Sequence, residues 1–286
     1  RYADMLIAPL FSEQAVLKER QAIEAKFSMK LKDDGRRIYQ AHKETINPEH
    51  PFAKFSVGNL QTLDDRAEQS AQQAVQQFYL EQYSASRMTL VTVSALPLQR
   101  QEELVMQHFM ALPSHLPAKP ALSVPLHQPE HLGIQLNIQP HKPTHRLVLS
   151  FSLPDIQPWY QFKVISFLAH ILGDEGPGSL LSLLKQQGLV NALNAGGGID
   201  GSNYKDFTLA FELTAAGMDA VKTITEQSFG YLQLLKQQPF PETLFFERQR
   251  LCQWSFLYQE PKSAQQLASD LAVNLQHYPV EDYIYG

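Results

Sequence analysis

The segment from Leu172 to Gly198 constrains the fold of this chain more than any other, and it reads LGDEGPGSLLSLLKQQGLVNALNAGGG. Residues 173–178 cannot continue a helix, because three glycines are costly there and a proline lacks the backbone donor. Ser179 then opens a short amphipathic helix with leucines on one face, and Gly188 ends it. Leu189–Ala195 predicts a strand, which runs into a flexible tip of three glycines. We therefore expect an open loop, a short helix and a strand in immediate succession.

A glycine-rich loop before a helix is typical of phosphate-binding sites, but this loop does not fit one. It lacks the Lys-Ser/Thr pair of a P-loop and the glycine spacing of a dinucleotide fingerprint. Asp174 and Glu175 would also place negative charge where an anion binds. Two interpretations stay open. The loop is a structural turn between two helices, or it lies beside a strand edge that takes an extended peptide, with Glu175 near the ammonium end of that peptide.

Composition excludes several classes of function. The chain has 286 residues, which is enough for two domains, and its 44% hydrophobic and 19% charged content is typical of a globular protein. Its net charge of −5 gives no bulk basic field to attract nucleic acid or anionic lipid. No apolar run is long enough to span a membrane. Cys252 is the single cysteine, so there is no internal disulfide and no thiol cluster for a metal. Localisation stays open between periplasm and cytoplasm.

The remaining pattern predicts helices alternating with a few strands. Prolines cluster from Pro113 to Pro129 and indicate a linker. We place a domain boundary there, between residues 1–119 and residues 120–286. Both halves fit an α+β class, each with helices on one face of a largely antiparallel sheet. Further predicted helices are Glu13–Lys32, Arg36–Thr45, Arg66–Tyr83, Gln101–Met110, Trp159–Leu172, Met218–Lys236, Pro241–Gln259 and Ser263–Leu275, and further predicted strands are Met88–Ser94, Gly133–Gln139, His145–Leu153 and Phe207–Leu213.

The inverted zinc motif H-x-x-E-H occurs once, from His127 to His131. Its chemistry needs two imidazoles on one helical face, with a glutamate as base for a metal-bound water. Pro129 lies inside the motif, and a proline in a helix interior costs about 3 kcal/mol. We interpret His127 and His131 as solvent-exposed linker residues rather than metal ligands. The other histidines, His42 among them, show no ligand spacing with a carboxylate on a common face.

Three long segments resemble the insulinase/pitrilysin family of zinc metallopeptidases, in collinear order over nearly the whole chain. They are Pro9–Gln40, Ile46–Leu63 and His170–Gly197. The resemblance implies the end of a first family domain and most of a second. It implies that an intact relative hydrolyses peptides with a zinc-bound water, inside a clamshell of two similar halves. The catalytic helix of the family would lie before Arg1, so we expect a fragment or a processed product, as the missing initial methionine also suggests.

The resemblance also identifies the position of the third zinc ligand. The family has two glutamates seven residues apart on the helix matching Glu13–Lys32, so both share one face. The first is Glu19, a neighbour of the site, but the ligand position holds Lys26. A lysine ammonium has no lone pair to donate and repels a divalent cation. We therefore expect this chain to bind no catalytic zinc and to cleave nothing. Alternatively, the full-length protein recruits another ligand, or Lys26 is not the native residue.

In the family, the loop and strand of the opening segment hold the N-terminal end of a peptide substrate. Carried over by position, the residues are His170, Gly173, Glu175, Leu193, Asn194 and Ala195. The expected partners are a peptide and either the remainder of the same polypeptide or a homologous half. The leading hypothesis is a fragment of a zinc metalloendopeptidase. The alternatives are a non-catalytic pseudo-protease that binds peptides or assists assembly, and a plain structural scaffold.

Overall fold

The computed structural model describes residues 1–285 and divides into two compact units, each assembled from segments that are separate in the sequence. Unit 1 comprises Arg1–Lys30, Val57–Ala121 and the described chain from Gln259 onward. Unit 2 comprises Leu31–Ser56 and Leu122–Tyr258. The predicted boundary between residues 119 and 120 stays a prediction.

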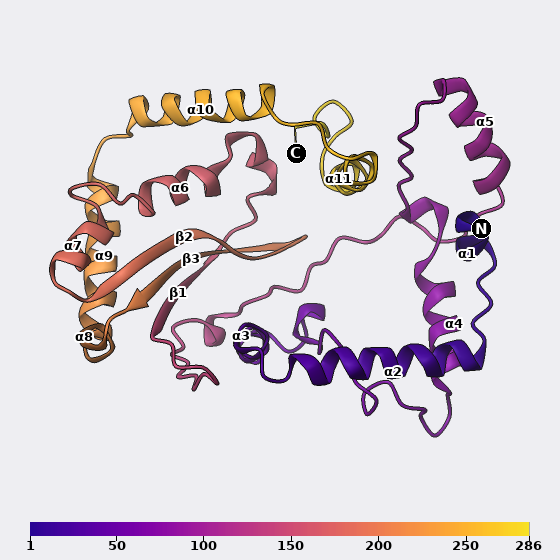
Figure 1. Ribbon diagram of the computed structural model, residues 1–286, viewed down its shortest axis with the longest axis horizontal. Helices are drawn as coiled ribbons and strands as arrows, with labels where there is room; N and C mark the ends of the chain where they lie inside the picture. The colour runs from indigo at the N-terminus through magenta and orange to yellow at the C-terminus, as the bar shows by residue number, and fades with distance from the viewer. Residues whose placement is uncertain (286) are drawn as a thin grey trace. The chain divides into compact units, whose positions relative to one another are not determined.

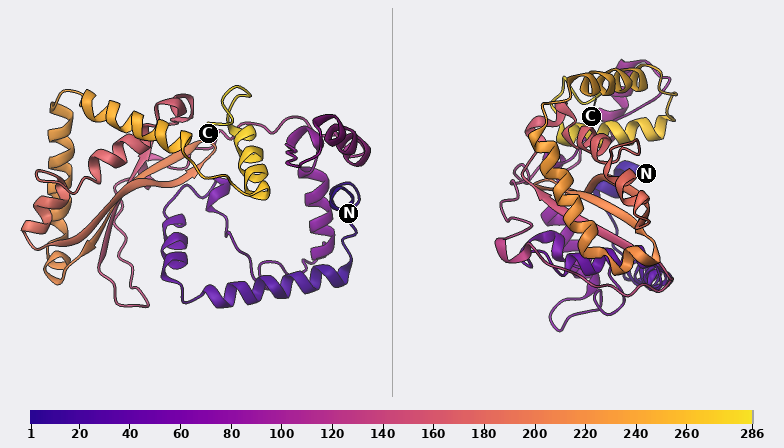
Figure 2. Two further views of the ribbon diagram at one scale, coloured as in Figure 1. Left: turned by 45° about the horizontal axis from the view of Figure 1, so that its top comes forward. Right: turned by 90° about the vertical axis from the view of Figure 1, so that its left-hand side faces the viewer.

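Unit 2 is built on a three-stranded antiparallel sheet in the order β1-β3-β2. Its strands are β1 (Arg146–Leu153), β2 (Val190–Gly201) and β3 (Tyr204–Leu213). The strands predicted at these places are confirmed. The predicted flexible glycine tip is wrong, because β2 continues through residues 196–198 and pairs with β3, with an irregularity between Gly197 and Asp200. Pairing with β3 extends the strand through glycines that have little strand preference of their own. β2 and β3 form a long twisted ribbon (Figure 1, Figure 2).

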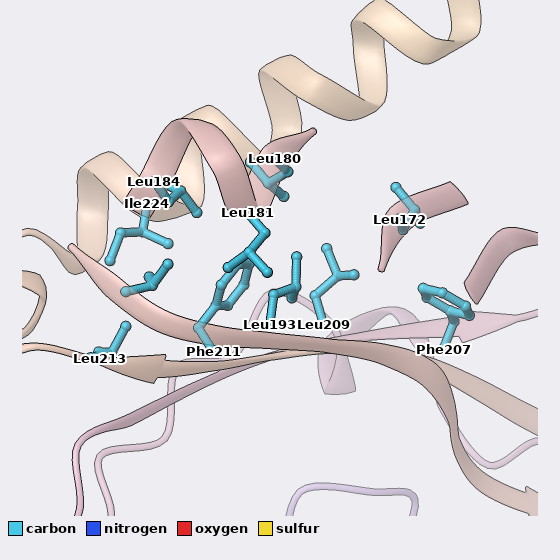
Figure 3. Packing of buried hydrophobic residues seen from close by; sticks show 11 residues of the cluster. Leu172, Leu180, Leu181, Leu184, Leu193, Phe207, Leu209, Phe211, Leu213 and Ile224 are labelled. Carbon is cyan, nitrogen blue, oxygen red and sulfur yellow. The ribbon is translucent and has the colours of Figure 1, made fainter. Parts of the chain in front are cut away.

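Helices cover one face of this sheet and form the core with it. Leucines of α7 (Leu180–Gln186) point toward Leu193 of β2 and toward Leu209 and Phe211 of β3, and Ile224 of α9 (Val221–Gln237) joins them (Figure 3). Burying each of these side chains contributes about 1.5–3 kcal/mol. Along β1 exposed and half-buried residues alternate strictly, as expected for a strand with one covered face. The predicted α+β class is confirmed.

The helix ends follow from local sequence. Ser179 caps α7, since its Oγ accepts a hydrogen bond from the Ser182 backbone N–H at 3.1 Å. Gly188 follows the helix with φ +69°, a conformation that glycine adopts without steric cost. The predicted helix Trp159–Leu172 is interrupted, because Lys163 has φ 49° and separates a 3-10 segment from α6. The other helical segments of unit 2 are α3 (Asp34–Lys43), η1 (Pro51–Ala53), η3 (Pro129–His131), η4 (Gln157–Phe162), α6 (Val164–Leu172), α8 (Ala215–Asp219) and α10 (Glu242–Leu257).

Unit 1 is helical in its described residues, and its longest element is α2 (Glu13–Lys30). α4 (Ala71–Gln82) begins with a capping box between Ser70 and Gln73. The predicted strands Met88–Ser94 in unit 1 and Gly133–Gln139 in unit 2 are wrong, since neither segment pairs with a strand within residues 1–285. Both are extended chain without the ladder hydrogen bonds that define a sheet. The other helical segments of unit 1 are α1 (Tyr2–Ile7), η2 (Ala85–Arg87), α5 (Leu98–Phe109) and α11 (Ala264–His277).

In the described part of the chain, no helix combines the length and apolar content needed to cross a membrane.

Candidate functional site

The outer edge of β2 is open in unit 2. β2 is the last strand of the order β1-β3-β2, and no strand of the described residues pairs with its other side. An edge strand presents backbone N–H and C=O groups that can pair with an extended chain. This is the geometry needed for a peptide to bind as an additional strand.

The loop after α6 lies against this strand. A Cβ atom placed on Gly173 would lie 3.6 Å from Ala195 Cβ and 2.8 Å from the Ala169 carbonyl oxygen. Gly173 has an ordinary φ of −93°, so close approach rather than backbone conformation accounts for the glycine. Two predicted site residues that are distant in sequence, Gly173 and Ala195, are therefore neighbours in space.

Glu175 stands on this loop with an exposed side chain. Its Oε2 is 4.0 Å from Lys185 Nζ, and the two side chains are 72% and 46% exposed. Exposed pairs of this kind contribute little and separate readily. Asp174 is also exposed, and its Oδ2 accepts a hydrogen bond from the Gly176 N–H at 3.2 Å. The loop thus carries two carboxylates, and that of Glu175 can turn toward a ligand ammonium.

The other predicted residues differ in which groups they offer. His170 is exposed in the last turn of α6. Leu193 is 5% exposed and its side chain belongs to the core, so only its backbone is available. Asn194 is exposed on the opposite face of the sheet, where it lines a polar pocket of about 530 Å³ with Arg146 and Glu212. The six predicted residues therefore do not form one cluster of side chains. Leu193, Asn194 and Ala195 share the backbone of β2, and Gly173 of the loop lies against it.

In unit 1, Glu19 and Lys26 share one face of α2, as their spacing predicts. Lys26 Nζ lies 3.9 Å from Glu19 Oε1, and both side chains are about two-thirds exposed. Glu24 is turned elsewhere, and its Oε2 accepts a hydrogen bond from the Leu60 N–H at 2.8 Å. Lys26 thus places an ammonium beside the Glu19 carboxylate, and the Glu24 carboxylate is already hydrogen-bonded. This donor set does not fit a divalent zinc ion.

The pentapeptide from His127 to His131 is not a zinc helix. Only Pro129–His131 is helical, as one 3-10 turn, so the two imidazoles do not share a helical face. His131 Nδ1 accepts a hydrogen bond from the Gln128 N–H at 3.1 Å. The prediction that His127 is exposed is wrong, since its side chain is 10% exposed and its Nε2 lies 3.8 Å from Asp206 Oδ1. Within residues 1–285, no group of His, Cys, Asp or Glu side chains has an arrangement suited to a metal ion.

Sequence reasoning missed a second feature of unit 2, a cluster of His42, His127 and Asp206. These residues come from α3, the proline-rich segment and β3, and they meet only in the fold. One signal was present in the sequence. Asp206 directly precedes Phe207 and lies in the same strand as the apolar Leu209, and a charged residue at such a place indicates a specific partner.

Known proteins share the sequence pattern and the fold of this chain. A family model described as "Peptidase M16 inactive domain" matches residues 71–251. Insulin-degrading enzyme-like 1, peroxisomal, from Arabidopsis thaliana is 32% identical over 289 residues, covering 100% of this chain and 30% of that protein. The crystal structure of pitrilysin superposes with a TM-score of 0.89 at 28% identity, covering 99% of this chain and 30% of that one.

Separate halves of proteins with this fold have also been solved. The first half of the periplasmic protease PqqL from Escherichia coli superposes with a TM-score of 0.69 at 15% identity, covering 99% of this chain and 61% of that one. That level of identity shows the fold alone.

The chain spans about 30% of the length of the relatives that it matches. The family model covers more than half of the chain, and the predicted resemblance is confirmed. The chain belongs to the M16 peptidase family, the insulinase/pitrilysin family that its sequence resembles.

Proposed function

We propose that this chain is the peptide-holding part of an insulinase/pitrilysin-like protein and that it has no catalytic zinc of its own. The observation that carries this proposal is the open edge of β2 beside the loop at Gly173, which lies against Ala195. A peptide added there would be held mainly by its backbone, so many sequences could bind.

Each site residue has a separate role in this proposal. The backbone groups of Leu193–Ala195 pair with the extended peptide, and Gly173 lets the peptide approach the loop closely. Glu175 accepts hydrogen bonds from the ammonium group at the N-terminus of the peptide. His170 lies exposed in the last turn of α6 and borders the same loop.

The proposed lack of zinc chemistry rests on Lys26 of α2. In the family, zinc activates a water for peptide hydrolysis, but Lys26 cannot serve as a ligand and its ammonium stands next to Glu19. We also propose that residues 1–119 belong to a first family domain and residues 120–286 to a second. The remainder of the same polypeptide or a homologous half would complete the chamber.

A pair of peptides tests the binding role. A short peptide with a free N-terminus and the same peptide acetylated are titrated by fluorescence anisotropy. We expect acetylation to weaken binding about threefold to tenfold, which corresponds to about 0.7–1.4 kcal/mol for an exposed charged contact. Glu175→Gln should bind both peptides with the affinity that the unaltered protein has for the acetylated one.

Glu226→Gln is the matched control, because Glu226 is 66% exposed and lies 3.9 Å from Lys222, as Glu175 lies 4.0 Å from Lys185. This variant should keep the full preference for the free N-terminus. Equal affinity of the unaltered protein for the two peptides, or no binding at all, would refute the role of Glu175.

A zinc metalloendopeptidase is the second candidate, and family membership favours it. It requires that the protein hold zinc with ligands other than Lys26. The metal content of the full gene product, measured by mass spectrometry after dialysis, separates the two candidates. We expect no stoichiometric zinc, and about one zinc per chain would favour the metallopeptidase.

A further inference from the structure

A buried carboxylate lies between two imidazoles in unit 2. Asp206 is 1% exposed. Its Oδ2 is 3.7 Å from His42 Nε2, and its Oδ1 is 3.8 Å from His127 Nε2. The two imidazole rings are 6.4 Å apart between centroids, in an edge-to-face arrangement. Each oxygen of one carboxylate therefore faces one imidazole nitrogen.

The polar atoms of this cluster are not satisfied by the rest of the described chain. Asp206 Oδ1, His42 Nε2 and His127 Nδ1 are buried and form no hydrogen bond within residues 1–285. Buried polar atoms are almost always hydrogen-bonded, and an isolated buried charge is strongly unfavourable. Among the described residues, only the imidazole nitrogens of His42 and His127 lie within ion-pair distance of the Asp206 carboxylate.

Several other titratable groups surround the cluster in the described part of the chain. Tyr204 of β3 lies beside Asp206 and Tyr39, and burial raises the pKa of Tyr204 to about 12, so that it is neutral at physiological pH. Asp200 of β2 pairs with Lys205 at 2.6 Å. Lys43 is a third charged neighbour, and its Nζ donates hydrogen bonds to Ser56 Oγ at 2.6 Å and to the Lys54 carbonyl oxygen. Glu130 and His131 are also titratable and lie on the same segment as His127.

The cluster joins three parts of unit 2 that are far apart in sequence. His42 belongs to α3, His127 to the segment before β1, and Asp206 to β3. We propose that His42, Asp206 and His127 form a proton-sensitive latch, which holds the segment Leu31–Ser56 on the sheet at neutral pH and releases it on acidification. With one imidazole protonated, the latch is neutral. A second proton gives it a net positive charge inside the protein.

The direction of the pH effect follows from His42. Burial lowers the pKa of His42, the Asp206 carboxylate opposes that shift, and His127 adds to it, so the net change is downward from 6.5. Opening exposes His42 to water, where it regains its ordinary pKa. The open state therefore binds more protons below pH 6.5, and acid favours opening. The opening constant is the ratio of molecules with Leu31–Ser56 released to molecules with it held. If His42 stays neutral while the latch is closed, this constant rises about tenfold between pH 7.5 and pH 5.5.

Hydrogen–deuterium exchange of peptides from Leu31–Ser56 measures this opening. Rates at pH 5.5, 6.5 and 7.5 are corrected for the intrinsic pH dependence of exchange and converted to opening constants. We expect the tenfold rise in the unaltered protein. We expect less than a twofold rise in His42→Gln, because glutamine does not titrate. His145→Gln, which changes an exposed histidine of the same unit, should keep the tenfold rise.

Three outcomes of the exchange and NMR measurements would overturn the latch. These are a flat opening constant in the unaltered protein, a full acid response in His42→Gln, and an NMR titration of His42 in the unaltered protein at or above its ordinary pKa. The NMR titration needs no variant, so it decides the question even where His42→Gln does not fold. Zinc chloride added at pH 7.5 provides the remaining test. Slower opening that depends on His42 would identify the cluster as a metal site and likewise overturn the latch.

Discussion

Lys26 Nζ lies 3.9 Å from Glu19 Oε1, two helical turns along one exposed face of α2. Glu19 also lines a groove of about 520 Å³ between α2 and α4, with Val16, Ile23 and Phe78 among its walls. The two residues form a pair of opposite charges. Under the proposed function, this pair stands where the family has two glutamates, so the chemistry of the position differs while its spacing on the helix is kept.

Lys26→Glu should alter the free energy of unfolding by less than about 1 kcal/mol, because both side chains are largely exposed and such pairs contribute little. Urea denaturation at pH 7 measures it, with Lys26→Gln as the neutral control. We expect Lys26→Glu to be slightly less stable than the control, since two carboxylates then face each other. A loss above about 2 kcal/mol in both variants would show that Lys26 is a structural residue.

Gly173→Ala should destabilise unit 2 by about 1–3 kcal/mol, because the added methyl group would meet the Ala169 carbonyl oxygen at 2.8 Å. Gly196→Ala is the matched control, as a Cβ there has nothing within 4 Å and alanine suits a strand better than glycine. It should be neutral or slightly stabilising. Equal losses in the two variants, measured by urea denaturation, would contradict the close contact between the loop and β2.

The sequence predicted correctly those features of the fold that depend on neighbouring residues alone, such as helix ends and the alternation along a strand. Ser179 and Gly188 mark the ends of α7, and the alternation in β1 follows from one covered face. Met88–Ser94 was mispredicted because its apolar run says nothing about whether a partner strand is present. The glycines after Ala195 were mispredicted for the converse reason, since β3 holds them in a strand.

The candidate site likewise has some features that local sequence predicts and others that depend on the complete fold. That Leu193 and Asn194 face opposite sides of β2 follows from the two-residue period of a strand. The contact of Gly173 with Ala195 depends on how α6 packs against β2, which no local pattern gives. The approach of His42 to Asp206 similarly requires the complete fold of unit 2, because the two residues lie far apart in the sequence.

Leu184→Ala should cost about 2–5 kcal/mol, because Leu184 is fully buried between α7 and the sheet and its truncation leaves a cavity. Leu183→Ala on the same helix is the control. Leu183 is 43% exposed, so its loss should stay below about 1 kcal/mol. Similar losses in the two variants, measured by thermal unfolding at one pH, would mean that α7 packs on the sheet through another face.

Asp34→Asn should destabilise unit 2 at pH 7 but not in acid. Asp34 accepts hydrogen bonds from the backbone N–H groups of Lys142 at 3.0 Å and His141 at 2.7 Å, and from Arg37 at 2.9 Å. These bonds, that of Lys142 first, lower the pKa of Asp34 below its usual 3.8.

The folded state therefore binds the Asp34 proton less tightly than the unfolded chain does. The stabilisation by Asp34 is complete well above pH 3.8 and is lost as the pH falls through the lower pKa of the folded state. Unfolding curves of the two proteins should consequently differ at pH 7 and converge on acidification below pH 3.8. Asp219→Asn, at an exposed position of the same unit, controls for the loss of one negative charge. The prediction fails if the free energies of unfolding of Asp34→Asn and the unaltered protein differ by the same amount at pH 7 and at pH 3. The asparagine would then perturb packing, and the carboxylate charge would not hold the segment at His141.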